Sequence, residues 1–437
     1  MAGVFCFSNV KKTWRYLQKN GFASAFMAAW ERLEESRRLA YSYEPPDKET
    51  LLAQRNEATK QEQPVRFSVV TPVYEKTPKA HLLALLDSLL AQSWPFWELV
   101  LADASRDDSV KEILTAWAKE KGAPILGEGQ PFTAGSLRYL RLKENLGISE
   151  NTNAGLGAVQ GEYTGLLDHD DLLTPDALYE MARAIKKERD GGREPLAFYS
   201  DEDKCDATGH TFYEPHFKTE FDPELILSNN YICHFLVMQT ELFGRLRLRR
   251  AYEGAQDYDL VLRAVGEGIS FVHVPRVLYH WRCHAESTAL NPESKQYAYE
   301  AGRRAIEDFC RQRGWRARVS PLPHLGFYRV DYKAIWEDRP QLGAVAFPVI
   351  RKRRLISGIY EETGAMRYEG LRAGFTGPMH RARLQQQAGA VALDQLRIRP
   401  GLEKAYRTAL AIEGGSQAQA EAFSRLLAQR GLHILWD

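Results

Sequence analysis

Short runs rich in β-forming residues alternate with apolar stripes of helical spacing, and this alternation constrains the fold more than any other feature. The segments 67–74, 97–105 and 137–142 are typical of strands, and helical stripes follow the first two at 82–90 and 110–117. A strand–helix–strand order requires crossover connections, which make neighbouring strands parallel and place helices on the faces of the sheet. We therefore predict an α/β fold with a mainly parallel sheet.

Another apolar run, residues 163–167, reads as a buried strand and ends directly in Asp168, His169, Asp170 and Asp171. Ligands of open α/β sheets bind at the carboxyl ends of the strands, so these side chains are expected where a ligand binds. Clustered carboxylates repel one another unless a cation lies among them, and oxygen ligands suit Mg²⁺ or Mn²⁺. The pattern indicates an enzyme that acts on a nucleotide diphosphate.

The other expected strands also end in polar residues. These are Thr71, Tyr74 and Glu75 at the first strand, Asp103 at the second and Asn145 after the third. Asp103 could accept a hydrogen bond from the N3–H of a pyrimidine, or it could cap the loop at 104–108. Tyr74 could contact the base. No GxGxxG sequence follows the first strand, which argues against a dinucleotide site of the Rossmann type.

The composition argues against several classes of protein. The 437 residues carry a net charge of +1, so the basic excess of a nucleic-acid-binding domain is missing and no nucleic-acid partner is expected. Five scattered cysteines without a CxxC pair indicate free thiols in a reducing cytoplasm. No apolar stretch is long enough to span a bilayer, and no signal-peptide core is present. We expect a cytoplasmic protein, free or attached to the inner face of the membrane.

Residues 10–39 have the spacing of an amphipathic helix. Residues 1–39 carry seven basic and three acidic side chains, with two tryptophans among them. This pattern is typical of a helix that lies in a membrane interface, but it equally fits a helix packed on the catalytic domain, and both interpretations stay open. Residues 44–64 are polar and bounded by prolines, which predicts a linker.

Five motifs, in their order along the chain, resemble those of family 2 glycosyltransferases with a GT-A fold. They are Thr71-Pro72-Val73-Tyr74, Leu101-Ala102-Asp103-Ala104-Ser105, Asn145-Leu146-Gly147, Asn153-Ala154-Gly155 and Leu167-Asp168-His169-Asp170-Asp171. The resemblance extends over residues 67–311 and includes enzymes that build bacterial surface polysaccharides such as O-antigen. It implies a GT-A domain at 64–315, with a Rossmann-like sheet and helices on both faces. An N-terminal helix and linker at 1–63 would precede it, and a small α+β region at 316–437 would follow.

The resemblance implies an inverting enzyme that moves a sugar from a nucleotide-diphosphate sugar, with UDP or dTDP favoured, to a glycan or lipid-linked acceptor. Asp257 would be the catalytic base, although Gln256 stands where the family usually has an acid. Asp170 and His280 would hold a divalent metal, Mn²⁺ or Mg²⁺, while Asp171 would cap a helix or support its loop. The donor would contact Thr71, Pro72, Tyr74, Glu75, Asp103, Asn145, Gly147, Asn153, Asp168 and Arg282, and the acceptor would contact Asp201, Glu202 and Trp281.

Two alternative functions stay open. A sugar-nucleotide nucleotidyltransferase also binds a metal on an α/β sheet, but residues 73–78 lack its Gly-rich basic loop. A non-catalytic scaffold of a polysaccharide assembly complex would not need Asp170 and Asp257, and both are present. No QxxRW motif occurs, which favours an enzyme that adds one or a few sugars over a processive synthase. Residues 358–413 resemble part of a second transferase-like unit without an acid cluster.

Overall fold

The computed structural model describes residues 17, 21–22, 26–27, 29–31, 41–127, 129–283, 296–361 and 363–437. These residues pack into two compact units. The sheet unit comprises Tyr41–Phe221 and Asn230–Phe309, and the C-terminal unit comprises Cys310–Asp437, Asp222–Asn229 and the described residues before Tyr41. The segment Asp222–Asn229 therefore packs with the C-terminal residues. The predicted division of the chain at residue 315 did not include this exchange.

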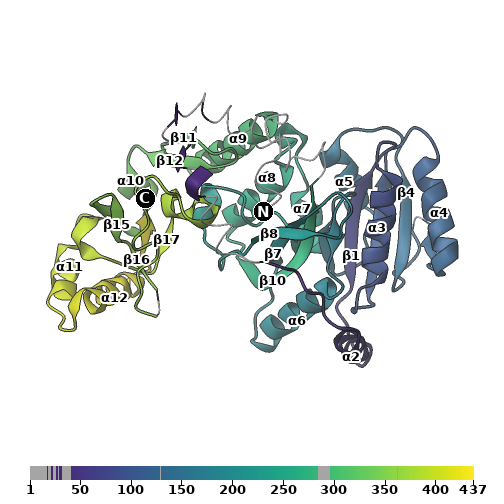
Figure 1. Cartoon of the computed structure of the whole chain (residues 1–437), viewed down its shortest axis with the longest axis horizontal. Coiled ribbons are helices and arrows are strands. Elements are labelled where there is room, and N and C mark those ends of the chain that lie inside the picture. The colour runs from purple at the N-terminus through teal and green to yellow at the C-terminus, as the bar shows by residue number, and fades with distance from the viewer. Residues whose placement is uncertain are drawn as a thin grey trace. The chain divides into compact units, whose positions relative to one another are not determined.

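The sheet unit is built on a ten-stranded sheet (Figure 1). Its strands are, in spatial order, β3 (Ile125–Leu126), β4 (Ser136–Arg141), β2 (Trp97–Asp103), β1 (Phe67–Val73), β5 (Tyr163–Leu166), β9 (Val237–Gln239), β7 (Ala197–Cys205), β10 (Phe271–Arg282) and β6 (Leu172–Leu173), with β8 (Phe212–His216) paired to β7. The strands from β3 to β5 are parallel to one another, which confirms the predicted parallel sheet. Strand β9, by contrast, runs antiparallel to both of its neighbours, β5 and β7.

Helices accompany this sheet, and several of them bury apolar side chains in one core with its strands. They are α3 (Lys79–Leu90), α4 (Ser109–Lys121), α5 (Ile148–Leu156), α6 (Ala177–Asp190), α7 (Thr240–Leu246), α8 (Gln256–Gly266) and α9 (Gln296–Gln312). Leu82 and Leu86 of α3 are fully buried in one core with Val69 of β1 and Leu99 of β2. Helices α3 and α4 lie alongside β1 and β4 (Figure 1). Burial of each such side chain contributes about 1.5–3 kcal/mol to the stability of the fold, and this burial attaches the helices to the sheet.

The linker prediction for residues 44–64 was wrong, because these residues contain helix α2 (Lys48–Thr59). Asp47 caps this helix by accepting a hydrogen bond from the Thr50 amide at 2.7 Å. Gln54 accepts a hydrogen bond from the Ser93 hydroxyl at 2.7 Å and is buried. The polar composition did not indicate a helix, because this helix is stabilised by a cap and by polar side chains rather than by an apolar stripe.

The C-terminal unit contains a four-stranded sheet and two helices that pack on it (Figure 1). The sheet has the order β17 (Gln386–Ala388), β20 (His433–Trp436), β13 (Leu342–Ala346) and β19 (Leu396–Ile398), and the helices are α11 (Glu403–Leu410) and α12 (Gly415–Ala428). Smaller pairs are β11 (Ala317–Pro321) with β12 (Tyr328–Tyr332), β14 (Val349–Arg351) with β15 (Arg354–Ser357), and β16 (Ile359–Tyr360) with β18 (Ala390–Val391), and α10 is Ile335–Asp338. The expected α+β character of this region is confirmed.

Most of the expected helix at 10–39 lies outside the described residues. The part that is described contacts the C-terminal unit, because the Glu31 carboxylate accepts hydrogen bonds from the amides of Thr376 at 2.7 Å and Gly377 at 2.6 Å. The guanidinium of Arg372 lies 4.3 Å from the ring centre of Trp30. These contacts favour packing for residues 30 and 31, while Phe22 remains 75% exposed. Among the described helices, none combines the length and the apolar character that crossing a membrane requires.

Candidate functional site

The carboxyl ends of β1, β2 and β5 meet at one edge of the sheet, as the parallel register requires. Val73 at the end of β1 pairs with Asp103 at the end of β2, and Val70 pairs with Leu166 of β5. The ring of Tyr74 lies 5.6 Å from the ring of His169, measured between centres. The structure therefore brings three of the predicted strand ends together at the edge where ligands of such sheets bind.

Asp103 is fully buried, and both of its carboxylate oxygens have partners within the chain. Its Oδ1 accepts a hydrogen bond from the Ser105 amide at 2.8 Å, and its Oδ2 accepts one from the Tyr139 hydroxyl at 2.6 Å. Arg141 is 3.3 Å from the same Oδ2. Asp103 thus caps the loop that follows β2, which was one of its two predicted roles. Its other predicted role, a hydrogen bond to the nucleotide base, stays a prediction.

Residues 168–171 form what we call the acid loop, and strand β10 fixes its conformation. Asp171 accepts hydrogen bonds from the Tyr279 hydroxyl at 2.6 Å and from the Arg282 amide at 2.7 Å. Arg282 also donates from Nε to the Asp170 carbonyl, at 2.5 Å, and from a terminal nitrogen to the Ala207 carbonyl, at 2.9 Å. Asp171 supports the loop, as expected. Arg282 gives Nε and one terminal nitrogen to backbone carbonyls, its buried Nη2 has no hydrogen-bond partner among the described residues, and its role in binding the donor stays a prediction.

The acids of the loop share one environment. Burial raises the pKa of Asp171 well above its ordinary value, and the nearby charges of Asp170 and Asp168 raise it further. Burial likewise raises the pKa of Asp168, which also experiences the charges of Asp170 and Asp257. A cation among these groups would relieve the repulsion that raises both pKa values.

His234 is the residue of this site that the sequence analysis missed. One ligand atom each of Asp168, Asp171 and His234 lie within 4.8 Å of one another. Carboxylate oxygens and an imidazole nitrogen fit a divalent cation such as Mn²⁺. The available signal was a polar pair, Cys233 and His234, inside the apolar run that begins at Tyr231.

Glu202 holds His234 from behind. Its Oε2 lies 3.0 Å from Nδ1 of His234 and 3.5 Å from Nζ of Lys218, and its Oε1 lies 3.3 Å from Nδ1 of His216. Burial alone would raise the pKa of Glu202, but Lys218, His216 and His234 outweigh it and hold this pKa well below its usual range. Glu202 is therefore a buried anion that orients a histidine.

These contacts do not suit the predicted acceptor roles of Asp201 and Glu202. Asp201 is 3% exposed, and its Oδ1 accepts a hydrogen bond from the Lys218 amide at 2.8 Å and lies 2.8 Å from Nε2 of His273. Both carboxylates therefore bind partners inside the fold. Trp281 is the one of the three predicted acceptor residues that keeps a partly exposed ring, 5.8 Å from the His234 ring.

His280 lies on the other face of β10 from Tyr279, because successive side chains of a strand point to opposite faces. Its Nδ1 is 2.5 Å from Oδ1 of Asp203, and its ring packs between Tyr43 and Phe212 with centre distances of 4.5 and 4.2 Å. Tyr279, by contrast, contacts both Asp171 and the stacked ring of His234. The structure therefore removes His280 from the acid loop, which corrects its predicted place beside the metal.

Asp257 lies in the first turn of α8, and two side chains of the loop before β9 bind it. Asn230 donates from Nδ2 to Oδ2 of Asp257 at 2.7 Å, and the Cys233 thiol donates to the same oxygen at 3.3 Å. Gln256 instead accepts a hydrogen bond from the Gly254 amide at 2.7 Å. Asn230 and Cys233 thus orient Asp257, whereas the side-chain oxygen of Gln256 binds the Gly254 amide.

The remaining predicted donor residues divide into two groups. Asn145, Gly147 and Asn153 have local structural contacts. The Asn153 amide exchanges two hydrogen bonds of 2.8 Å with the backbone of Leu248, and Asn145 accepts one from the Gly147 amide at 3.1 Å. Gly147 has φ +95°, and a Cβ there would lie 2.5 Å from the Glu253 carboxylate, so only glycine fits.

Thr71, Pro72, Tyr74 and Glu75 lie at the end of β1, beside the acid loop. Pro72 and Tyr74 are partly exposed there. Buried oxygens of Thr71 and Glu75 have no hydrogen-bond partner among the described residues. Unpartnered buried oxygens are costly, so this strand end is where a bound ligand would supply hydrogen bonds.

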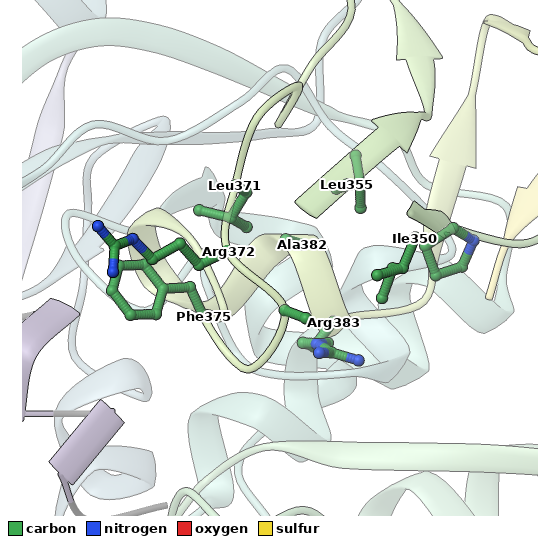
Figure 2. Close-up of a pocket in the computed structure, with 9 residues that line it drawn as sticks. Ile350, Leu355, Leu371, Arg372, Phe375, Ala382 and Arg383 are labelled. Carbon is green, nitrogen blue, oxygen red and sulfur yellow. The ribbon is translucent and has the colours of Figure 1, made fainter. Parts of the chain in front are cut away.

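Figure 2 shows a hollow in the C-terminal unit, with Arg372 and Phe375 on one side and Ile350 and Leu355 on the other. Its volume of about 10 Å³ has room for one water molecule. Pockets for small organic ligands usually have volumes of about 300–1,000 Å³. This hollow is therefore too small to be a donor site.

Comparisons with known proteins agree with the sheet unit. The family model described as "Glycosyl transferase family 2" matches residues 68–246. An uncharacterized protein, y4gI of Sinorhizobium fredii, is 34% identical over 62% of this chain and 28% of its own length. The O-antigen biosynthesis protein RfbC of Myxococcus xanthus is 33% identical over 61% of this chain and 20% of its own length. The chain thus spans less than a third of these two relatives.

Among solved structures, TarS of Staphylococcus aureus, residues 1–349 in complex with UDP-GlcNAc, aligns with a TM-score of 0.41 at 18% sequence identity. The alignment covers 56% of this chain and 66% of the TarS chain.

Proposed function

We propose that this chain transfers a sugar from a nucleotide-diphosphate sugar to a glycan or lipid-linked acceptor, with inversion at the anomeric carbon, because residues 68–246 match the model of glycosyl transferase family 2. The observation that carries this proposal is that Cys233, which donates to Asp257 at 3.3 Å, precedes His234, a ligand atom of which lies within 4.8 Å of Asp168 and Asp171 of the acid loop. A donor bound at the acid loop would place its reacting carbon within reach of a carboxylate base.

In the proposed mechanism Asp257 takes the proton from the acceptor hydroxyl while that oxygen attacks the anomeric carbon from the face opposite the nucleotide. Asn230 and Cys233 hold Oδ2 of this carboxylate, which leaves Oδ1 for the proton. A divalent cation, when bound by the acid loop, would neutralise charge on the departing diphosphate. Positioning and electrostatics supply most of the acceleration, since the fold fixes the carboxylates before the donor arrives.

The biological setting is proposed on the same basis. RfbC is named for O-antigen biosynthesis, and we place this chain in the synthesis of a bacterial surface polysaccharide. The described cysteines Cys205, Cys233, Cys283 and Cys310 form no disulfide, which suits a cytoplasmic location. A lipid-linked acceptor would bring the enzyme to the inner face of the membrane.

The proposal is tested by thermal denaturation with UDP-, dTDP- and GDP-sugars, each with Mn²⁺, Mg²⁺ or EDTA. A ligand at 100 times its Kd stabilises the native state by about 2.7 kcal/mol, so one class of nucleotide should raise the melting temperature in a metal-dependent manner. A melting temperature that no nucleotide sugar changes would favour the non-catalytic scaffold.

A further inference from the structure

The described N-terminal residues of the C-terminal unit present two different faces. One face packs on the unit. The Glu31 carboxylate accepts the amides of Thr376 and Gly377, and Met27 lies so close to Gly374 that a Cβ there would be 3.2 Å from its Cε. Helical residues four positions apart lie on the same face, so Met27 and Glu31 attach one face to the unit.

The other face carries aromatic side chains. Phe22, Phe26 and Trp30 are helical and also recur every four residues. The ring centres of Phe22 and Phe26 are 6.5 Å apart, and those of Phe26 and Trp30 are 5.7 Å apart. Phe22 is 75% exposed and Phe26 is 54% exposed. Single exposed apolar residues are common on a surface, but adjacent exposed rings are typical of a surface that binds a partner.

Arg372 joins this aromatic row to the hairpin of β14 and β15. Its guanidinium lies 4.3 Å from the ring centre of Trp30, and its backbone forms an antiparallel bridge with Arg354 of β15. The next amide, of Ala373, donates to the Arg353 carbonyl at 2.7 Å. Hydrogen bonds and a cation–π contact therefore connect the aromatic row to the tip of the hairpin within one unit.

The tip of the hairpin is strongly basic. Residues 351–354 are Arg, Lys, Arg and Arg, and all four side chains are exposed. Among the ion pairs that the described residues form, none includes a side chain of this run. Ile350, which is 42% exposed, lies at the base of the tip and lines the same hollow as Arg372 (Figure 2). Cations and apolar groups thus share one surface.

The turn of this hairpin is not shaped for its own stability. Lys352 and Arg353 occupy the two turn positions with φ of 47° and 60°. L side chains resist this left-handed conformation, and Asn-Gly is the sequence that suits such a turn best. Two cations therefore stand where local folding favours other residues, which points to a ligand for their charges.

We call Phe22, Phe26 and Trp30, together with the hairpin tip at 350–354 and Arg372, the aromatic–basic surface. We propose that this surface binds an anionic lipid bilayer. Aromatic rings are favoured at the depth of the lipid headgroups, and exposed Lys and Arg are attracted to an anionic leaflet. A second copy of this chain is a poorer occupant, because the same surface on both copies would bring like charges together.

The inference goes beyond the proposed function and does not rest on it. It also unites the two interpretations of residues 10–39, because the described part packs on the chain by one face and offers the other face to the membrane. No membrane-spanning helix is needed for such binding, since an amphipathic surface lies in the interface and does not cross the bilayer.

The test is sedimentation of the full chain with vesicles of phosphatidylcholine, either pure or containing about 30% phosphatidylglycerol as the anionic lipid. The chain should bind the anionic vesicles more tightly than the neutral ones. Raising NaCl from about 0.1 M to 1 M shortens the Debye length from about 10 Å to 3 Å, so it should weaken this binding. A chain that binds neither kind of vesicle, or binds both equally, overturns the inference.

The first variant combines Lys352→Asn with Arg353→Gly. It removes two cations but installs the sequence that suits the turn, so the melting temperature should stay the same or rise. Affinity for the anionic vesicles should fall roughly 30-fold, which corresponds to about 1 kcal/mol for each charge. An unchanged affinity would overturn the role of the hairpin, and misfolding cannot explain a loss that accompanies an unchanged melting temperature.

The matched control combines Lys404→Gln with Arg407→Gln. Both residues are exposed on α11 of the same unit, outside the aromatic–basic surface, and the control removes the same charge. Its affinity for the anionic vesicles should stay close to that of the wild type. A loss as large as in the hairpin variant would show a general attraction of charge and would overturn the assignment to this surface.

The second variant combines Phe22→Ser with Phe26→Ser. It should lower the affinity for anionic vesicles at least about tenfold, because two apolar side chains no longer enter the interface. Sedimentation velocity without vesicles tests the rival occupant. Wild-type dimers that this variant abolishes would assign the surface to a second copy and overturn the inference. Nucleotide sugars should shift the melting temperature equally in the wild type and all variants, so a failure of the proposed function is seen separately.

Discussion

The hydroxyl of Tyr279 donates a 2.6 Å hydrogen bond to Oδ2 of Asp171, which is 1% exposed. Asp171 also accepts a hydrogen bond from the Arg282 amide, so two residues near the end of β10 hold the end of the acid loop. Because strand β10 is paired along its length with β7, the loop that presents the acids is supported by the sheet rather than by its own sequence.

Tyr279→Phe tests this support. The change removes the hydrogen bond but keeps the ring that stacks on His234, so it should lower the free energy of unfolding by about 1–3 kcal/mol. Metal-dependent donor binding should weaken as well. Tyr163→Phe is the control. Its buried hydroxyl donates at 2.7 Å to the Pro195 carbonyl and makes no contact with the acid loop among the hydrogen bonds described. Urea denaturation measures the free energy of unfolding of both variants. Equal losses of this free energy in the two variants, together with unchanged donor binding in Tyr279→Phe, would contradict the supporting role of Tyr279.

Asp257→Asn tests the base. The amide keeps the size of the side chain but cannot take a proton, so kcat should fall by about 10²–10⁴-fold while donor affinity stays near that of the wild type. Gln256→Glu is the matched control at the neighbouring position, since its side-chain oxygen can still accept the Gly254 amide. Kinetics and donor titrations separate the two effects. Equal losses of kcat and donor affinity in Asp257→Asn would reject the assignment as base.

The acid loop could be predicted because its signal is local. Asp168 follows an apolar run without interruption, and parallel strands bring their carboxyl ends to one edge whatever the rest of the chain does. The same local logic placed Asp103 and Tyr74 at that edge. These residues required no knowledge of long-range pairing.

His234 and its contact with Glu202 could not be predicted, because the two residues are 32 positions apart and meet only when β9 inserts antiparallel between β5 and β7. The error at His280 has a related cause. The face of a strand residue depends on register, and the pairing of β10 with β7 shifts between Val274 and Val277 and again before Tyr279. Irregularities of this kind have no clear signature in the sequence.

Gly161→Ala should destabilise the sheet unit. A Cβ at this position would lie 2.5 Å from the Ser68 nitrogen and 2.6 Å from the Phe67 carbonyl carbon, and backbone atoms of a central strand cannot move aside. We expect a loss of about 1–3 kcal/mol or more. Gly244→Ala is the control, because Gly244 is exposed in α7 with no atom within 4 Å of its Cβ position. That change should stabilise by about 0.5–1 kcal/mol, and a loss there as large as at Gly161 would contradict the steric explanation.

Glu31→Ala should release the described N-terminal residues from the C-terminal unit. The change leaves the amides of Thr376 and Gly377 without their acceptor, which should cost about 1–3 kcal/mol. Hydrogen exchange at these two amides measures the effect directly. Phe22→Ser is the control, because a side chain that is 75% exposed should contribute little to folding. Unchanged exchange in Glu31→Ala would instead support a segment that is held elsewhere, such as at a membrane.

The C-terminal unit should lose stability in mild acid because of a buried histidine. Burial, together with the charge of His324, whose ring stacks on it at 3.7 Å, lowers the pKa of His380 to about 3. The unfolded chain takes up a proton near pH 6.5 and the folded chain does not, so stability is full above pH 6.5 and falls as the pH drops towards 3. The slope is at most about 1.4 kcal/mol per pH unit for this group.

His380→Asn tests this dependence, since asparagine tolerates the left-handed φ of +61° and has no proton to gain in this range. Melting temperatures of the wild type and of His380→Asn should converge as the pH falls from 7 to 4.5, because only the wild type carries the penalty of the neutral buried imidazole. Carboxylates titrate equally in both chains and cancel in the difference. The exposed His210 provides the control, and His210→Asn should track the wild type at every pH. A gap between the wild type and His380→Asn that stays constant with pH would show that His380 is not the group that titrates.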